Sequence, residues 1–246
     1  MIYLNGHSGC LVSLLDSNIV RKISPNELYN NRLLLQMNKQ MTFKHHLLFS
    51  PKVIDSGYDK HGLFFFDMEY IKGDSLSSIF RKESISNCEY LLDQIQTIHK
   101  YNSKKIDIFP DILKKLQAIE ASENDIGILK NCDWNVGTGF CHGDLTFENI
   151  IVCKNRIYLI DFLDSFVDAP LIDESKLLQD AFCYWSFGEG YIPKRKLIRV
   201  CSKFHSKQHY CMLLLHLIRI LPYSSNPIKE TVICMMNKVR NKINQF

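Results

Sequence analysis

Two carboxylates and one carboxamide stand around a predicted strand pair near the middle of the chain, which has 246 residues. The sequence predicts strands over residues 149–153 and 156–162, joined by a short turn. Asp144 and Asn149 therefore lie at the start of this hairpin and Asp161 at its end, so all three side chains meet at one end. Phosphoryl transfer needs a carboxylate that takes the proton of an attacking hydroxyl, and oxygen ligands for magnesium. Asp144 suits the first task, and Asn149 with Asp161 suits the second.

Each of these residues also has a structural interpretation. His142 and Asp144 could form a simple turn, and Asp161 could merely end a strand. Their combination in this order, around strands, favours the catalytic interpretation. We expect His142 to orient the loop that carries Asp144 rather than to act as an acid or base.

The motif resembles that of the aminoglycoside phosphotransferase and choline kinase superfamily. The matching residues are His142-Gly143-Asp144, then Asn149 after four intervening residues, and later Ile160-Asp161-Phe162. The resemblance implies a two-lobed protein-kinase-like fold, with Asp144 as catalytic base and Asn149 and Asp161 as magnesium ligands. It also implies ATP, or alternatively GTP, as the phosphoryl donor.

Periodicity predicts an α+β protein with a small β-rich N-lobe and a larger, mainly helical C-lobe. A hairpin is expected over residues 11–23, and further strands over 51–54 and 62–68. One helix to about Met41 opens at Ser24-Pro25-Asn26-Glu27, which has the form of a capping box. We place the N-lobe at residues 1–72 and the C-lobe at 73–246. Helices are expected in the C-lobe at about 75–82, 85–101, 110–122, 173–187, 194–205, 207–221 and 228–243.

Lys22 lies on the predicted strand Ile19–Ile23 and matches the lysine that contacts the nucleotide phosphates in related kinases. The alternative is a solvated lysine on an edge strand. Related kinases pair this lysine with a glutamate of the following helix, but Glu27 is the only acid there and its position suits capping. Gln36 lies deeper in the helix and could contact Lys22, so the partner stays open.

Two further segments are candidates for nucleotide contacts. Glu69 and Ile71 belong to the connector after the strand that ends at Met68, and the resemblance implies that this connector binds adenine through its backbone. The alternative is a plain interlobe linker. Gly6-His7-Ser8-Gly9 could cover the phosphates, because glycine permits close approach of backbone N–H groups, although a simple turn explains it equally well.

The expected acceptor is the hydroxyl of a small molecule such as a sugar, a glycan precursor, an amino alcohol or an aminoglycoside. A protein kinase is the less favoured alternative, because Gly143 replaces the catalytic-loop arginine, Leu163 replaces a glycine, and no Ala-Pro-Glu follows. A catalytically inert nucleotide-binding protein with the same fold is the other alternative. Glu230 is the only acid after residue 190. We therefore rank a polycationic aminoglycoside below the other acceptors.

The bulk composition excludes several other classes. A formal charge of +4 is too small to indicate nucleic-acid binding. The nine cysteines form no CxxC pair, so we expect no zinc site and a reducing cytosol. The start of the sequence does not resemble a signal peptide, and the apolar stretch over 211–221 is too short to span a bilayer. We expect a cytoplasmic protein without a membrane span, and the oligomeric state stays open.

Overall fold

The structure is a computed structural model that describes residues 2–4, 9–16, 18–188 and 190–246. By their contacts the residues form two compact units. Unit 1 comprises Met1–Lys82 and His142–Asp164, and unit 2 comprises Glu83–Cys141 and Ser165–Phe246. The predicted site residues all fall in unit 1. The lobe boundary after residue 72 stays a prediction, because the contact-defined units take segments from both sides of it.

The larger sheet of unit 1 is antiparallel and has the strand order β1-β2-β3-β6-β5 among the described residues. The predicted hairpin is present, since Leu11 pairs with Ile23 and Leu14 with Val20. The strands are β1 Ile2–Leu4, β2 Leu11–Leu14, β3 Ile19–Ile23, β5 Val53–Tyr58 and β6 Phe64–Glu69.

The helix beside this sheet begins as a 3-10 turn, η1 (Glu27–Tyr29), and continues as α1 (Asn30–Thr42). The expected capping box at Ser24 is wrong. The side chain of Asn26 caps the turn by accepting a hydrogen bond from the backbone N–H of Tyr29 at 3.1 Å. Ser24 is instead kept on the sheet, because its backbone N–H donates to the Phe64 carbonyl.

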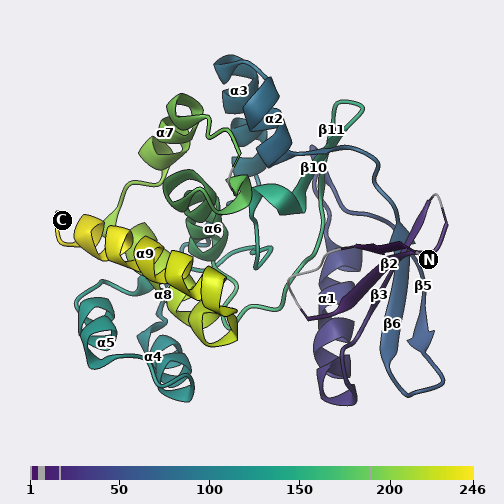
Figure 1. Cartoon of the computed structure of the whole chain (residues 1–246), viewed down its shortest axis with the longest axis horizontal. Helices are drawn as coiled ribbons and strands as arrows, with labels where there is room; N and C mark the ends of the chain where they lie inside the picture. Colours follow the sequence, from purple (N-terminus) through teal and green to yellow (C-terminus); the bar gives the residue numbers. More distant parts are fainter. Residues whose placement is uncertain (1, 5–8, 17, 189) are drawn as a thin grey trace. The chain divides into compact units, whose positions relative to one another are not determined.

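In unit 1, α1 lies beside the larger sheet (Figure 1), and an apolar core joins the two. Leu33 and Met37, four positions apart on α1, are buried against Phe64 and Phe66 of β6. Residues i and i+4 share one face of a helix and alternate residues share one face of a strand. The helix is thereby fixed to the sheet by one face, which leaves another face for polar contacts.

A second sheet of unit 1 carries the predicted catalytic hairpin and has the strand order β4-β11-β10-β7. Lys154 and Asn155 connect its two central strands, and both have a positive φ, of 48° and 62°. Two such residues form the type I′ turn that suits the twist of a tight hairpin. The strands are β4 Leu48–Phe49, β7 Asp74–Ser75, β10 Ile150–Cys153 and β11 Arg156–Leu159, and unit 1 also holds α2 Leu76–Lys82 and η2 Phe147–Asn149.

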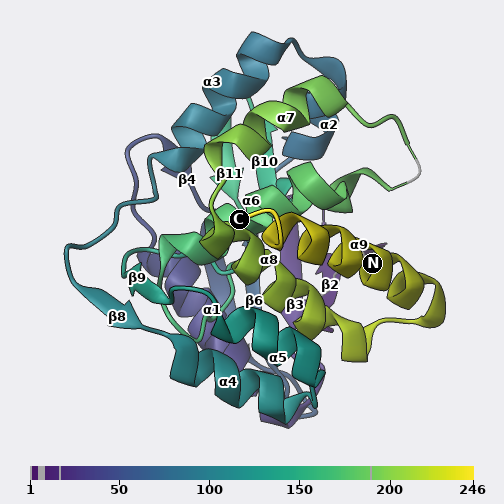
Figure 2. The ribbon, with the colours of Figure 1, turned by 90° about the vertical axis from the view of Figure 1, so that its left-hand side faces the viewer.

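Unit 2 is mainly helical (Figure 2). Two of its helices, α6 and α8, contain most of the buried helix residues among those described. The helix expected over 110–122 is α4, which already ends at Ala118. A further helix, α5, was not expected, and it begins after Ser122, whose side chain caps it. A short strand pair, β8 with β9, was not expected. The elements are α3 Ile85–Gln96, β8 Lys105–Asp107, α4 Phe109–Ala118, α5 Glu123–Lys130, β9 Asn135–Gly137, α6 Pro170–Cys183, η3 Trp185–Phe187, α7 Lys194–Lys203, α8 Lys207–Ile220, η4 Leu221–Tyr223 and α9 Asn226–Ile243.

The observed class is the expected one, an α+β fold with an antiparallel N-terminal sheet and a mainly helical C-terminal part. Across the described part of the chain, no helix combines the length and the apolarity that crossing a membrane requires.

Candidate active site

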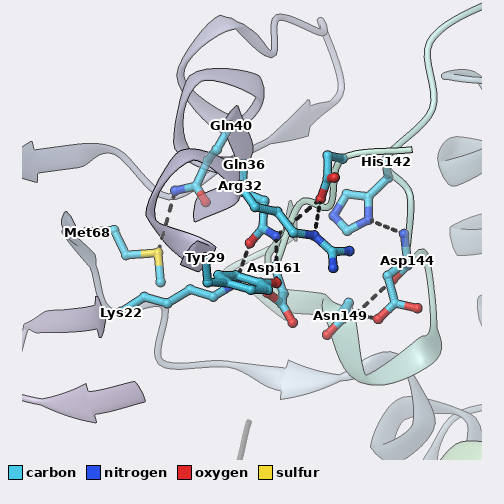
Figure 3. A network of polar contacts seen from close by, with 11 residues as sticks. Lys22, Tyr29, Arg32, Gln36, Gln40, Met68, His142, Asp144, Asn149 and Asp161 are labelled. Atoms are coloured by element: carbon cyan, nitrogen blue, oxygen red, sulfur yellow. Dashed lines mark hydrogen bonds and ion pairs between the residues drawn. The ribbon is translucent and has the colours of Figure 1, made fainter. Parts of the chain in front are cut away.

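A tight loop between His142 and η2 holds Asp144 and Asn149 together (Figure 3). Gly143 has a φ of +96°, a conformation that favours glycine. The Asn149 amide group donates from Nδ2 to the Asp144 carbonyl at 2.8 Å and to its carboxylate Oδ2 at 3.1 Å. Asp144 and Asn149, five positions apart in the sequence, are thus in direct contact through their side chains.

His142 is completely buried behind this loop. Its Nδ1 accepts a hydrogen bond from the backbone N–H of Asp144 at 3.3 Å, and its ring lies 4.4 Å from that of Phe162. Burial lowers the pKa of His142 to about 4, although the carboxylates of Asp144 and Asp161 oppose the shift. A neutral, buried imidazole that accepts a backbone hydrogen bond is suited to orienting the loop, and this role of His142 stays a prediction.

Asp161 follows β11 in a strained backbone conformation, with a φ of +59°. Backbone hydrogen bonds hold its neighbours against the loop that carries Asp144 and Asn149. The Ile160 N–H donates to the Asn149 carbonyl at 3.0 Å, and the Leu163 N–H donates to the His142 carbonyl at 3.0 Å. These contacts keep the Asp161 segment beside the loop that carries Asn149.

Lys22 reaches the Asp161 carboxylate from β3 and forms an ion pair with it (Figure 3). Its side chain is only 3% exposed. Burial by itself would lower the pKa of Lys22, but attraction and hydrogen bonding to Asp161 raise it above the ordinary value. The lysine is therefore charged, and Gln36 Oε1 accepts a second hydrogen bond from it at 3.1 Å. A glutamine of α1 is therefore the helix partner of Lys22, which the sequence had left open.

The donor atoms around Asp161 fit a magnesium ion. Asn149 uses its Nδ2 for both contacts with Asp144. Its Oδ1 accepts no hydrogen bond in the described part of the chain and could bind a cation. Asp161, whose preceding residue is hydrogen-bonded to Asn149, supplies carboxylate oxygens. Its side chain is 27% exposed. Within the described residues no group of three or more His, Cys, Asp or Glu side chains could hold a metal. Magnesium is commonly held by one or two protein oxygens together with substrate phosphates, so the pair would suffice.

Sequence reasoning missed part of this network. Arg32 of α1 donates from Nε to Asp164 Oδ1 at 2.7 Å, and Lys39 donates to the Leu163 carbonyl at 3.0 Å. The signal was present in the sequence, because residues 32, 36 and 39 are spaced to share one helix face. That spacing does not predict which residues the three side chains contact, because their partners in the Asp161 segment are more than a hundred positions away in the sequence.

The remaining predicted nucleotide contacts lie elsewhere in unit 1. Glu69 ends β6, where it pairs with Ile19 in the sheet register, and the Tyr70 N–H donates to the Asn18 carbonyl at 2.7 Å. Ile71 follows in the connector and is half-buried. Of the proposed phosphate-covering segment, residues 6–8 lie outside the described residues.

Known structures share this fold across almost the whole chain. A thermostable mutant of aminoglycoside phosphotransferase APH(4)-Ia in its apo form superposes with a TM-score of 0.64 at 13% identity, covering 99% of this chain and 94% of that one. The GDP complex of aminoglycoside 2'-phosphotransferase-IIIa gives a TM-score of 0.64 at 14% identity, covering 99% and 92%. A putative fructosamine-3-kinase from Haemophilus somnus 129PT gives 0.62 at 13% identity, covering 98% and 90%.

At such identities these similarities establish the fold alone. Among curated protein sequences, none matches the chain. The sequence model of one family does match, over residues 16–192. This stretch contains Lys22, the loop with Asp144 and Asn149, and Asp161. The chain therefore belongs to the APH family of phosphotransferase enzymes.

Proposed function

We propose that this phosphotransferase is a small-molecule kinase that uses ATP and magnesium. The observation that carries the proposal is the joint arrangement in unit 1 of Asp144 with Asn149 and of Lys22 with Asp161. Asp144 would accept the acceptor's hydroxyl proton. As the acceptor oxygen bonds to the γ-phosphorus, the bond from that phosphorus to the bridging oxygen breaks and the nucleoside diphosphate leaves.

The other residues would bind and orient the donor. Lys22 would exchange Asp161 for the phosphates, since its charge is retained in the buried site. Asn149 and Asp161 would hold magnesium, which when bound neutralises phosphate charge. His142 would keep the loop in place, and the backbone of Glu69 and Ile71 would contact the base.

A sugar hydroxyl is the acceptor class we favour. The solved relatives include aminoglycoside phosphotransferases, with hygromycin B or kanamycin bound, and a putative fructosamine-3-kinase. The scarcity of acids after residue 190 argues against a polycation as acceptor, so a neutral sugar, a glycan precursor or an amino alcohol ranks above an aminoglycoside. Related structures hold ADP, AMP-PNP or GDP, which supports ATP while keeping GTP as the alternative donor.

The test is release of ADP or GDP from Mg-ATP or Mg-GTP with a panel of sugars, amino alcohols and aminoglycosides. We expect one acceptor class to stimulate release in the wild type and not in Asp144→Ala, which should still bind nucleotide. Equal turnover by the two proteins would contradict the assignment of Asp144. Nucleotide binding without turnover on any acceptor would favour the inert alternative, which the neutral partner of Lys22, Gln36, also favours.

A further inference from the structure

One polar face of α1 holds the segment that follows Asp161. Arg32, Gln36 and Lys39 are four and three positions apart, so they project from the same side of the helix. Arg32 Nε lies 2.7 Å from Asp164 Oδ1, Gln36 Nε2 lies 3.4 Å from the same oxygen, and Lys39 Nζ lies 3.0 Å from the Leu163 carbonyl. The opposite face of α1 is anchored in the apolar core of unit 1. The segment is therefore attached to a fixed element.

The residue in front of this segment is under backbone strain. A left-handed conformation at a residue other than glycine, such as Asp161, is unfavourable and persists only where the surroundings enforce it. The Lys22 ion pair and the flanking backbone hydrogen bonds provide part of that enforcement. On the C-terminal side it comes from the contacts with α1.

In the proposed kinase, Lys22 would bind the nucleotide phosphates. The Asp161 carboxylate would then lose its partner on β3. Gln36 is neutral and forms no ion pair with the segment. Arg32 and Asp164 supply an ion pair between α1 and the segment. Arg32 is also restrained by the Tyr29 ring, whose centroid lies 5.2 Å from the guanidinium carbon.

We propose that Arg32 and Asp164 form a latch that positions Asp161 to bind the magnesium of the nucleotide complex. The proposal rests on the proposed kinase function and adds two positioning residues to it. Figure 3 shows Arg32 extending from α1 into the network that contains Asp161. Both side chains of the latch are partly exposed, 43% and 36%. An exposed ion pair contributes little to folding, so its removal should leave the protein folded.

The first measurement is hydrogen exchange of the backbone amides at residues 160–164 without nucleotide. In the wild type the Leu163 amide is protected by its hydrogen bond to the His142 carbonyl. We expect faster exchange in Arg32→Met, because loss of the Arg32–Asp164 ion pair would let this segment open more often. The matched control is Arg21→Met. Arg21 forms an ion pair with Asp67 at 2.7 Å and lies 3.8 Å over the Phe65 ring, and strand alternation places it on the sheet face opposite Lys22. The control should leave exchange in this segment unchanged.

The second measurement is the magnesium dependence of AMP-PNP binding. We expect Arg32→Met and Asp164→Asn each to raise the magnesium concentration for half-maximal binding by about tenfold, the lower end of the range for residues that support metal ligands. The double variant should be no worse than either single variant, and AMP-PNP affinity without magnesium should be unchanged. Exchanging the charges, with Arg32→Asp and Asp164→Arg together, should restore part of the loss.

The outcomes separate the latch from the kinase assignment. Unchanged hydrogen exchange in Arg32→Met, or additive effects of the two single substitutions, would refute the latch whatever the protein binds. Weaker binding of AMP-PNP but not ADP without magnesium would also refute it, because that pattern means direct contact of Arg32 with the terminal phosphate. If exchange accelerates but the wild type binds neither ATP nor GTP analogues, Arg32 and Asp164 position the Asp161 segment, and the magnesium role is refuted together with the proposed function.

Discussion

Removing the Asp161 carboxylate should destabilise unit 1 as well as abolish activity. In Asp161→Ala the ammonium group of Lys22 remains buried, with Gln36 as its remaining side-chain partner in the described site. Breaking a buried ion pair from one side costs about 3–5 kcal/mol, because the other charge is left uncompensated. Asp161 is 27% exposed, so water would reach part of the site. We therefore expect a loss of about 2–3 kcal/mol in the free energy of unfolding.

Removing the uncompensated charge of Lys22 should reverse this loss of stability. Lys22→Met in the Asp161→Ala background should recover most of the stability, while turnover stays absent. The pKa of Lys22 in Asp161→Ala should fall below its ordinary value, because burial would no longer be opposed by a carboxylate. An uncharged state reached at high pH should then partly restore the stability of Asp161→Ala.

Urea unfolding followed by far-ultraviolet circular dichroism is the suitable assay. The two tryptophans, Trp134 and Trp185, both belong to unit 2, so their fluorescence would not report on unit 1. Asp67→Ala is the matched control, because its partner Arg21 is 30% exposed and can be hydrated. We expect that control to lose about 1 kcal/mol or less. Equal stability of Asp161→Ala and the wild type, or no recovery in the double variant, would refute the reasoning.

Three further predictions concern stability. Burial lowers the pKa of His99 and of His142 to about 4. Between pH 6.5 and 4 the unfolded chain therefore binds more protons than the folded one. As the pH falls through that window, the free energy of unfolding should decrease by up to about 3 kcal/mol per histidine. In urea unfolding, His99→Gln should show a weaker pH dependence than the wild type, and an unchanged slope would contradict this. Asn155→Gly should not destabilise the hairpin whereas Asn155→Val should, because the φ of 62° suits glycine; equal melting temperatures would count against the turn assignment. Leu33→Ala, at a fully buried position, should lose about 2–5 kcal/mol, and Leu35→Ala, 49% exposed, under about 1 kcal/mol by the same unfolding assay; similar losses would contradict the packing of α1.

The sequence by itself determined the features that depend on neighbours along the chain. Asp144 and Asn149 are five positions apart, and their contact forms within one loop. The hairpin that carries Asp161 is closed by Lys154-Asn155, whose local conformational preference suits a tight turn. Helix periodicity likewise located α1 and most helices of unit 2. These elements follow from local sterics and from the burial of one apolar face, which a single sequence displays.

Tertiary structure decided the features that join distant segments. Lys22 and Asp161 are 139 positions apart, and Arg32 and Asp164 are 132 apart. Gln36 contacts Lys22 because α1 packs on the sheet, which the sequence alone does not show. Asn26 caps the helix in place of Ser24, because the backbone N–H of Ser24 is hydrogen-bonded to β6. No local preference encodes such pairs. They form because burying the apolar face of α1 leaves its polar face toward the Asp161 segment, where charged side chains find partners that compensate for lost water.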